Sequence, residues 1–319
     1  MTFGLSRIDF EMGPATREAF GNALAEAGSD ERIVVCDGDV NNSTYTNKFA
    51  AKYPDRFFNV GIAESNLIGI TSGLAACGKI PVAASFSTFL LSNAFDQIRM
   101  SIAFPNQNVK LVGTHAGISI GEDGPSQMAI EDVALACALP GFTVIVPADG
   151  PSTAAATRAM IERAGPTFLR CGRPSVPLVY SDGQEWHLGK ATTLRQGDDV
   201  TIIANGIMVA MALDAADGLA DEGIEARVLD MHTVKPVDVV AIERAANETR
   251  GIVVAEEHLA YGGLGATVAM VVAERSPSHM AFVDLGDNYA TSGKPDELLA
   301  QYGLTPDAVA DAARRLLKD

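Results

Sequence analysis

Residues 57–84 read FFNVGIAESNLIGITSGLAACGKIPVAA. The apolar runs at 57–60 and 81–84 predict strands, and apolar spacing near 3.6 residues over 64–77 predicts a helix between them. A strand, a helix and a second strand in this order are typical of a parallel sheet with crossover helices. This stretch therefore places the chain in the α/β class.

The same alternation of strands and helices extends on both sides of this stretch. Short β-branched runs predict strands, and several predicted helices begin near Ser, Asp or Pro. We therefore expect a doubly wound α/β domain at residues 1–180. Its other strands are expected at 32–36, 109–114, 143–147 and 166–170, and its other helices at 16–27, 93–103, 129–137 and 151–162.

A second doubly wound α/β domain is expected at residues 190–319. Residues 171–190, CGRPSVPLVYSDGQEWHLGK, hold two prolines, turn residues and the single tryptophan, Trp186, which indicates a linker. The alternation then resumes, with strands expected at 200–204, 226–230, 251–256 and 280–284 and helices at 208–222, 237–248, 264–275 and 306–317.

The charge balance limits the partners of the chain. Its 319 residues include 24 Lys and Arg against 40 Asp and Glu, for a net charge of −16. Such a surface repels nucleic-acid phosphates and anionic membranes. An anionic substrate would therefore need a local cluster of basic residues.

Neither the N-terminus nor the cysteines suggest an oxidising compartment. MTFGLSRIDFEMG has no long apolar run, and no stretch approaches the ~20 apolar residues of a membrane span. Cys36, Cys77, Cys137 and Cys171 are never closer than 34 residues, which favours buried free thiols over zinc or disulfides. We expect a cytoplasmic protein.

Two glycine-containing strings resemble nucleotide motifs without completing them. In CDGDVNN, Asn41 and Asn42 follow directly, whereas a diphosphate–Mg²⁺ signature has its asparagines about two dozen residues later on another element. We expect a polar loop at the end of a strand that contacts substrate. The GGLG string at 262–265 completes no G-x-G-x-x-G frame, so we expect a glycine turn before a helix.

Three strings between Phe57 and Asp149 stand out from a generic α/β domain. Glu64 heads a long apolar helix, where an acid is favoured by about 0.3–1 kcal/mol but could also share a proton. Phe86, Phe89 and Phe95 lie within ten residues and would pack in the core or stack on a flat ring. The third string, GTHAGISIGEDGPSQMAIED at 113–132, is poor in core formers, which predicts a polar functional loop.

Together with ATREAF, CDGDVNNST, PDRF and GIAE, these strings resemble the pyrimidine-binding domain of transketolases. The resemblance continues into the second domain at LDMHTVKPVD, EEHLAYGGLG and SGKPDELL, and the GPSQM form is similar to animal-type enzymes. Transketolases have a further domain that binds thiamine diphosphate through its diphosphate and Mg²⁺. The resemblance therefore implies the C-terminal subunit of a split transketolase, whose N-terminal subunit is a separate polypeptide in an expected α2β2 assembly.

The resemblance implies roles at the cofactor. Glu64 would hydrogen-bond the aminopyrimidine ring of thiamine diphosphate and stabilise its imino tautomer. Phe89 would stack on that ring, and Phe86 or Phe95 would complete the aromatic pocket. Mg²⁺ would be held mainly by the partner subunit, because this chain lacks the matching signature.

The resemblance also implies a sugar-phosphate site. Arg17 in ATR, Ser43 in NNST, His115 in GTHAG and Arg173 in GRP match four phosphate-binding positions of the family. Two guanidinium groups could bind a phosphate dianion through charge-assisted bonds, which supplies the local basic cluster that an acidic protein needs.

Further family positions refine the substrate site. Asp123 resembles a residue that hydrogen-bonds a sugar hydroxyl. Gln127 stands where many microbial transketolases carry histidine, and it cannot exchange a proton near neutral pH. His258 and Lys235 lie in the second domain, and we expect both to be structural.

Several alternatives stay open. The nearest rivals within the cofactor class are the β subunits of 2-oxoacid dehydrogenases and deoxyxylulose-phosphate synthase, which the GEDGPSQM loop disfavours. A split transketolase could also be specialised for a sulfosugar or a branched-sugar phosphate. A catalytically silent partner subunit is the remaining alternative, and the presence of Glu64 argues against it. No constellation supports a serine or metal hydrolase.

Overall fold

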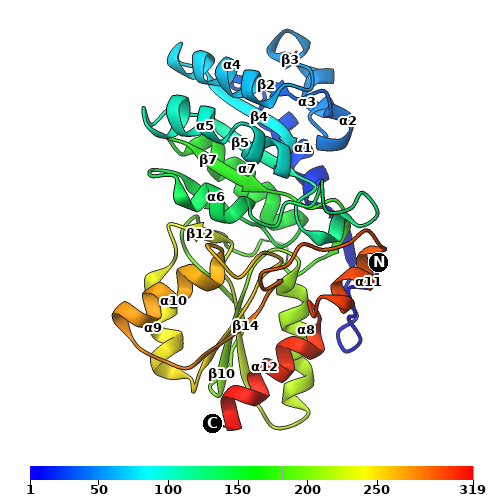
Figure 1. Ribbon diagram of the computed structural model, residues 1–319, viewed down its shortest axis with the longest axis vertical. Helices are drawn as coiled ribbons and strands as arrows, with labels where there is room; N and C mark the ends of the chain where they lie inside the picture. Colours follow the sequence, from blue (N-terminus) through cyan, green and yellow to red (C-terminus); the bar gives the residue numbers. More distant parts are fainter. Residues whose placement is uncertain (182, 319) are drawn as a thin grey trace.

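A seven-stranded sheet forms the upper unit in Figure 1, in the order β12-β6-β7-β5-β4-β2-β3. The computed structural model describes residues 1–181 and 183–318. All neighbours in this sheet are parallel except β12, which pairs antiparallel with β6. The strands are β2 (Ile33–Asp37), β3 (Phe57–Asn59), β4 (Ile80–Phe86), β5 (Lys110–Thr114), β6 (Thr143–Ile145), β7 (Thr167–Arg170) and β12 (Thr233–Lys235).

Helices cover both faces of this sheet, which confirms the doubly wound α/β class. The bounds predicted for α1 (Thr16–Ala27) are those observed, and α1 packs beside α7 (Gly150–Glu162) and α3 (Asn47–Lys52) on one face. The opposite face carries α4 (Glu64–Ala76) and α6 (Asp132–Ala138).

The helix expected at 93–103 was wrong in its start and in its winding. The helical region begins at Phe89 and winds as π-helical turns at Phe89–Asn93 and Ile98–Ala103, with α5 (Phe95–Gln97) between them. Leu90, Leu91, Ile98 and Ile102 are fully or almost fully buried, so tertiary packing determines this irregular winding.

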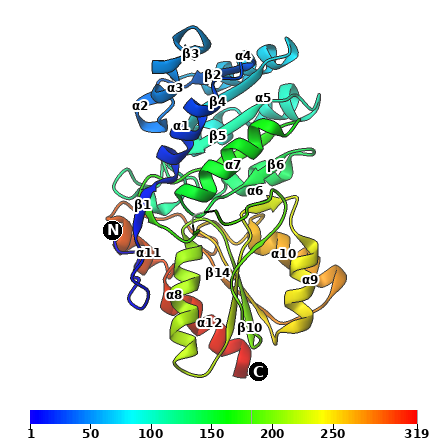
Figure 2. The same cartoon turned by 180° about the vertical axis from the view of Figure 1, so that it is seen from behind.

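The lower unit contains a five-stranded sheet in the order β14-β13-β10-β11-β9 (Figure 2). Its strands are parallel except β9, which pairs antiparallel with β11. Helices α8 and α12 cover one face, and α9 and α10 cover the other. The bounds are β9 (Thr192–Arg195), β10 (Val200–Ala204), β11 (Ala226–Asp230), β13 (Ile252–Ala255), β14 (Met280–Val283), α8 (Met208–Ala220), α9 (Val239–Glu248), α10 (Leu264–Arg275), α11 (Pro295–Gln301) and α12 (Pro306–Lys318).

Parts of the segment 171–190, expected to be a linker, form regular structure or pack against the rest of the chain. Within it, β8 (Ser175–Pro177) pairs antiparallel with β1 (Met12–Ala15). The indole of Trp186 is half-buried and stacks on the imidazole of His232, with ring centroids 4.2 Å apart. The division at residues 180 and 190 remains a prediction, and β12 of the later segment belongs to the first sheet.

The loop at 113–132 corrects a second expectation, because its apolar side chains enter a core. Ile118, Ile120, Met128 and Ile130 are at most 1% exposed and belong to the hydrophobic cluster of the lower unit, together with α8 and α12 residues. The loop is polar only on its other side. The amino-acid composition gave no sign that part of the loop is buried, because these four apolar residues are spread among glycines and charged residues.

The carboxyl ends of the two sheets face each other. The Val146 amide, just after β6, donates to the His232 carbonyl at 2.7 Å, and the Gly206 amide, just after β10, donates to the Val146 carbonyl at 3.4 Å. In the first sheet the chain turns from β2 to β3 and then crosses back to β4, so a topological switch point lies between β2 and β4. In the second sheet the same reversal lies between β10 and β13. Open α/β sheets bind ligands at such points.

The four cysteines are free thiols, as expected, but they are not all buried. Cys36 and Cys171 are buried, whereas Cys77 is exposed just past the last turn of α4. The expectation for Cys77 was therefore wrong. Within residues 1–181 and 183–318 no helix is long and apolar enough to cross a bilayer. The cytoplasmic location remains a prediction.

Candidate active site

Arg17, in the first turn of α1, brings the predicted anion-binding residues together. One terminal nitrogen donates to the Ser43 carbonyl at 2.7 Å and lies 3.2 Å from His115 Nε2. Its Nε donates to the Arg173 carbonyl at 3.2 Å. Burial, with a further contribution from Arg173, lowers the pKa of the Arg17 guanidinium from its ordinary value. Four residues from four separate segments thus meet around one guanidinium.

His115 is held in a strained backbone conformation. Its φ of 59° lies in the left-handed region, and its ring stacks on Phe86 with centroids 3.8 Å apart. Burial, together with the charges of Arg17 and Arg173, lowers its pKa to about 3. The ring is therefore neutral. Since the Arg17 nitrogen can only donate, Nε2 accepts and Nδ1 donates to the Thr114 hydroxyl at 2.9 Å.

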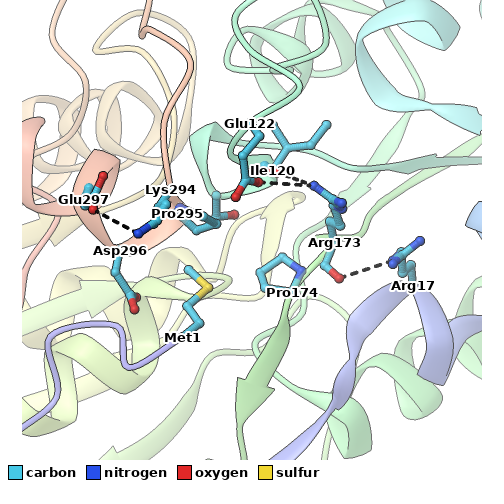
Figure 3. Close-up of a pocket in the computed structure, with 11 residues that line it drawn as sticks. Met1, Arg17, Ile120, Glu122, Arg173, Pro174, Lys294, Pro295, Asp296 and Glu297 are labelled. Carbon is cyan, nitrogen blue, oxygen red and sulfur yellow. Dashed lines mark hydrogen bonds and ion pairs between the residues drawn. The ribbon is translucent and has the colours of Figure 1, made fainter.

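A cleft of about 550 Å³ opens beside these residues (Figure 3). Arg173 lies on one side, where it donates to the Ile120 carbonyl at 2.8 Å and lies 3.8 Å from the Glu122 carboxylate and 3.9 Å from that of Asp123. Segment 294–297 lies on the other side. The cleft therefore combines permanent positive charge with carboxylates that could accept hydrogen bonds from hydroxyl groups.

The side chains of two predicted residues take no part in this cluster. The Ser43 carbonyl contacts Arg17, but its hydroxyl has no hydrogen bond among the described residues. The half-buried Gln127 accepts a hydrogen bond from the Ser126 hydroxyl through its side-chain oxygen. Neither side chain is engaged by the anion cluster, and their roles toward substrate remain predictions.

Glu64 is a buried carboxylate with an unused oxygen. It is the first residue of α4, is 6% exposed, and accepts a hydrogen bond from the Ser85 hydroxyl at 3.2 Å. Among the described residues its second oxygen has no hydrogen-bond donor. Ser85 belongs to β4, so Glu64 lies at the switch point of the first sheet.

Sequence reasoning did not single out Asp37 as a site residue. It is the last residue of β2, beside β4, the strand that carries the Glu64 partner Ser85, and it is fully buried. Its carboxylate accepts from the Val40 amide at 2.7 Å, the Thr44 hydroxyl at 2.7 Å and the Thr46 hydroxyl at 2.8 Å. Burial raises its pKa, and these bonds oppose that shift. Asp37 thus organises the loop that carries Ser43. Its position directly after a buried strand was the available signal.

The three phenylalanines occupy different environments. Phe86 and Phe89 are nearly parallel, with centroids 6.2 Å apart and an interplanar angle of 12°. Phe86 also stacks on His115, as described above, whereas Phe95 packs against the apolar core beneath α4. Phe86 directly follows Ser85, the hydrogen-bond partner of Glu64, and Phe89 lies parallel to Phe86, whereas Phe95 packs against the core.

Of the two glycine-containing strings, the one at 262–265 has a structural role, and the contact of the other with substrate remains a prediction. Within the described residues, no group of three or more His, Cys, Asp or Glu side chains could hold a metal ion. The glycine turn at 262–265 is confirmed: it precedes α10, and the Glu256 carboxylate accepts from the Leu264 and Gly265 amides at 2.8 and 2.7 Å. The chain's own carboxylate thus occupies this helix N-terminus.

His258 and Lys235 have the structural roles expected. His258 Nε2 accepts from the Ala134 amide at 3.3 Å, and the Lys235 ammonium donates to the Cys137 and Leu139 carbonyls at 2.8 and 2.7 Å. His258 therefore attaches the lower unit to α6, whereas Lys235, in β12 of the first sheet, holds the C-terminal end of α6 within the upper unit.

The chain is similar to known proteins along nearly its whole length. Residues 12–179 match the family described as transketolase, pyrimidine binding domain, and residues 189–309 match transketolase, C-terminal domain. A protein of Methanocaldococcus jannaschii described as a transketolase C-terminal section is 41% identical, over 92% of this chain and 93% of that protein.

Two further similarities concern subunits. A 6-deoxy-6-sulfo-D-fructose transketolase subunit from a Clostridium species is 40% identical over 94% of each chain. A solved structure described as a split-gene transketolase in an inactive β4 tetramer is 46% identical, with a TM-score of 0.90, and the alignment covers 96% of this chain and 99% of that one.

Proposed function

The chain belongs to the transketolase family, and we propose that it is the C-terminal subunit of a split transketolase. The enzyme would transfer a two-carbon ketol unit from a ketose phosphate to an aldose phosphate. The observation that supports this proposal best is that Arg17 and Arg173 line one cleft and that Arg17 also contacts His115, which is buried beside it.

The residues around Glu64 fit the thiamine diphosphate on which the family depends. A buried carboxylate with one unused oxygen could accept a hydrogen bond from a protonated ring nitrogen, as the aminopyrimidine requires. Glu64 would hold that nitrogen and Phe89 would stack on the ring, with Phe86 behind it. When bound, the cofactor supplies the carbon nucleophile for ketol transfer.

The chain's own residues would bind and orient the sugar phosphate. Arg17 and Arg173 supply two positive charges that remain at all physiological pH values. Asp123 would accept a hydrogen bond from a sugar hydroxyl, and Gln127 would orient a hydroxyl without exchanging its proton. His115 would contribute a neutral ring held between Arg17 and Phe86.

A partner subunit would complete the enzyme. We propose that an N-terminal transketolase subunit holds the cofactor diphosphate and Mg²⁺, in an α2β2 assembly. Two relatives that match this chain over more than nine-tenths of their length are described as a section and as a subunit of a transketolase. A third is described as inactive when four β chains assemble, which supports the need for a partner.

A second candidate is ketol transfer from a sulfosugar. The 40% identical Clostridium relative is described as acting on 6-deoxy-6-sulfo-D-fructose. A sulfonate has a similar shape to a phosphate and carries one negative charge, so the two arginines could bind either group. A catalytically silent subunit is disfavoured by the unused carboxylate oxygen of Glu64.

The test is a coupled transketolase assay on this chain, on the N-terminal subunit and on their mixture, with thiamine diphosphate and Mg²⁺. Xylulose 5-phosphate with ribose 5-phosphate is one substrate pair, and 6-deoxy-6-sulfofructose is the alternative donor. We expect activity with the phosphate pair in the mixture only. Turnover by this chain alone would contradict the split-enzyme proposal, and turnover of the sulfosugar alone would establish the second candidate.

A further inference from the structure

Glu257 is a buried carboxylate of the lower unit that contacts the substrate loop of the upper unit. It follows β13, is 5% exposed, and accepts a hydrogen bond from the Ser119 amide at 2.6 Å. The backbone at Gly117 passes directly over it, because a Cβ atom there would lie 2.1 Å from the carboxylate. Gly117 also has a φ of +83°, so this close approach requires glycine.

This contact occupies the switch point of the second sheet, between β10 and β13, where an α/β sheet ordinarily binds a ligand. The turn at 116–119 lies there instead. On either side of Ser119, Ile118 and Ile120 are fully buried in the core of the lower unit. The lower unit thus binds a loop of the upper unit at the place where a ligand would be expected.

Both ends of the same turn lead to the anion cluster. The Ile120 carbonyl, next to Ser119, accepts the hydrogen bond from Arg173. At the other end, His115 holds a left-handed backbone conformation, which costs energy and persists only when surrounding contacts impose it. The contact made by Glu257 at Ser119 therefore lies between His115 and Ile120, the residue that Arg173 contacts.

A small pocket supports this connection. A cavity of about 20 Å³ is bordered by Glu257 and by Thr16, Ala116 and Gly172. These last three are the chain neighbours of Arg17, His115 and Arg173. The carboxylate thus stands directly behind the backbone segments that carry the three anion-binding side chains.

The environment of Glu257 is compatible with a carboxylate that is mostly ionised near neutral pH. Its pKa is raised to about 6, because burial raises it and the charge of Arg170 opposes that shift only in part. Arg170 is itself held by both oxygens of Asp132, at 3.1 and 2.9 Å, and it donates to the Glu257 carbonyl at 3.0 Å. Arg170 and Asp132 belong to the upper unit, so the backbone of Glu257 is also held to that unit.

We propose that Glu257 is a positioning residue for the anion site, which fixes the turn at 115–120 so that His115 and Arg173 face the anion. It does not touch the substrate. The inference rests on the proposed function only in taking the physiological anion to be the charged group of a sugar, since the positioning itself concerns this chain alone.

The neighbouring Glu256 provides a matched control. It is 2% exposed and also accepts backbone hydrogen bonds, but from α10 within its own unit. We would prepare the full chain as Glu257→Ala, Glu257→Gln and Glu256→Ala. The readouts are the affinity for inorganic phosphate, measured by ³¹P NMR titration, and amide hydrogen exchange at Ser119.

Glu257→Ala should weaken phosphate binding by about tenfold or more, because the Ser119 amide loses a charge-assisted bond and the turn becomes mobile. The Ser119 amide should exchange faster by a comparable factor. Glu257→Gln retains an acceptor oxygen and should restore most of the affinity. Glu256→Ala should lower the melting temperature while phosphate affinity stays within about twofold of the parent.

Unchanged phosphate affinity in Glu257→Ala, or an equal loss in Glu256→Ala, would overturn the proposal. If Glu257→Ala does not fold, the parent chain still tests it: phosphate binding should slow exchange at Ser119, because coupling between two sites is reciprocal. Exchange that phosphate does not change would equally overturn it. A mixture without transketolase activity, in a chain that passes these tests, would count against the proposed function alone.

Discussion

The carboxyl edges of the two sheets share one topology and differ in how their carboxylates are used. At the first edge, Glu64 accepts a single hydrogen bond and keeps one oxygen free among the described residues. At the second edge, Glu256 accepts two amides and Glu257 accepts the Ser119 amide. Topology therefore marks both places equally. Glu257 also accepts a single hydrogen bond, but a turn of this chain packs directly against it, whereas the donor to Glu64 is a side chain of its own sheet.

Asp37 shows that burial does not make this distinction. It lies at the first edge and is even more buried than Glu64, but three donors form hydrogen bonds with its oxygens. A buried carboxylate with all its acceptors occupied stabilises a loop. At Glu64 one acceptor oxygen has no donor among the described residues and could accept from a partner outside the chain.

The largest expected effect separates these two carboxylates. Glu64→Gln should lower kcat of the reconstituted enzyme by at least about 100-fold, because a neutral amide cannot share a proton with the cofactor ring. The amide oxygen can still accept from Ser85, so the melting temperature should stay within about 2 °C.

Asp37→Asn is its control. It should destabilise the chain by about 1–3 kcal/mol, because an amide NH₂ would face the hydroxyl and amide donors, while kcat stays within about tenfold. Steady-state kinetics and thermal unfolding measure both variants. A near-normal rate in Glu64→Gln would remove the contrast between the two residues.

Arg173→Ala tests the anion end of the first edge, with a smaller effect. We expect KM for phosphorylated sugars to rise by about 10- to 100-fold, because one charged hydrogen-bonding group is lost. For the same sugars without phosphate, KM should change by less than about threefold. Equal losses for both sugar types would show that Arg173 holds the loop through Ile120 and does not bind the anion.

The smallest expected effect is an absence of pH dependence. His115 has a pKa of about 3, so it stays neutral as the pH falls from about 8 to 6 and adds no charge to the site. Sulfate, which keeps its charge over this range, should therefore bind within about twofold across it. An affinity for sulfate that rises several-fold towards pH 6 would mean that His115 gains a proton. It would also mean that the His115 ring is less buried than the structure shows.

Regular elements followed from the sequence where local pattern and packing agree. The predicted bounds of α1, β10, β11 and α10 are those observed, because each is a short apolar run or an amphipathic helix between clear turn residues. The short strands β1, β8, β9 and β12 were missed, since three or four residues with mixed burial carry no readable period.

The anion cluster was assembled from motif resemblance, and the structure brings Arg17, His115 and Arg173 together. Glu257 could not be placed in the same way. Glu257 directly follows a predicted strand, but the partner amide lies 138 residues away in another unit. Glu257 and Ser119 meet only because the carboxyl edges of the two sheets face each other, and no local sequence pattern predicts that arrangement.

The edge strand β12 has a consequence for how the molecule unfolds. It lies beyond the segment 171–190 in sequence but completes the first sheet against β6, while Phe3 from the other end of the chain is buried in the lower core. Each unit thus includes residues from the part of the sequence that otherwise forms the other unit. Neither should melt separately, and a proteolytic nick between them should leave two fragments that remain bound, behaving as one cooperative unit.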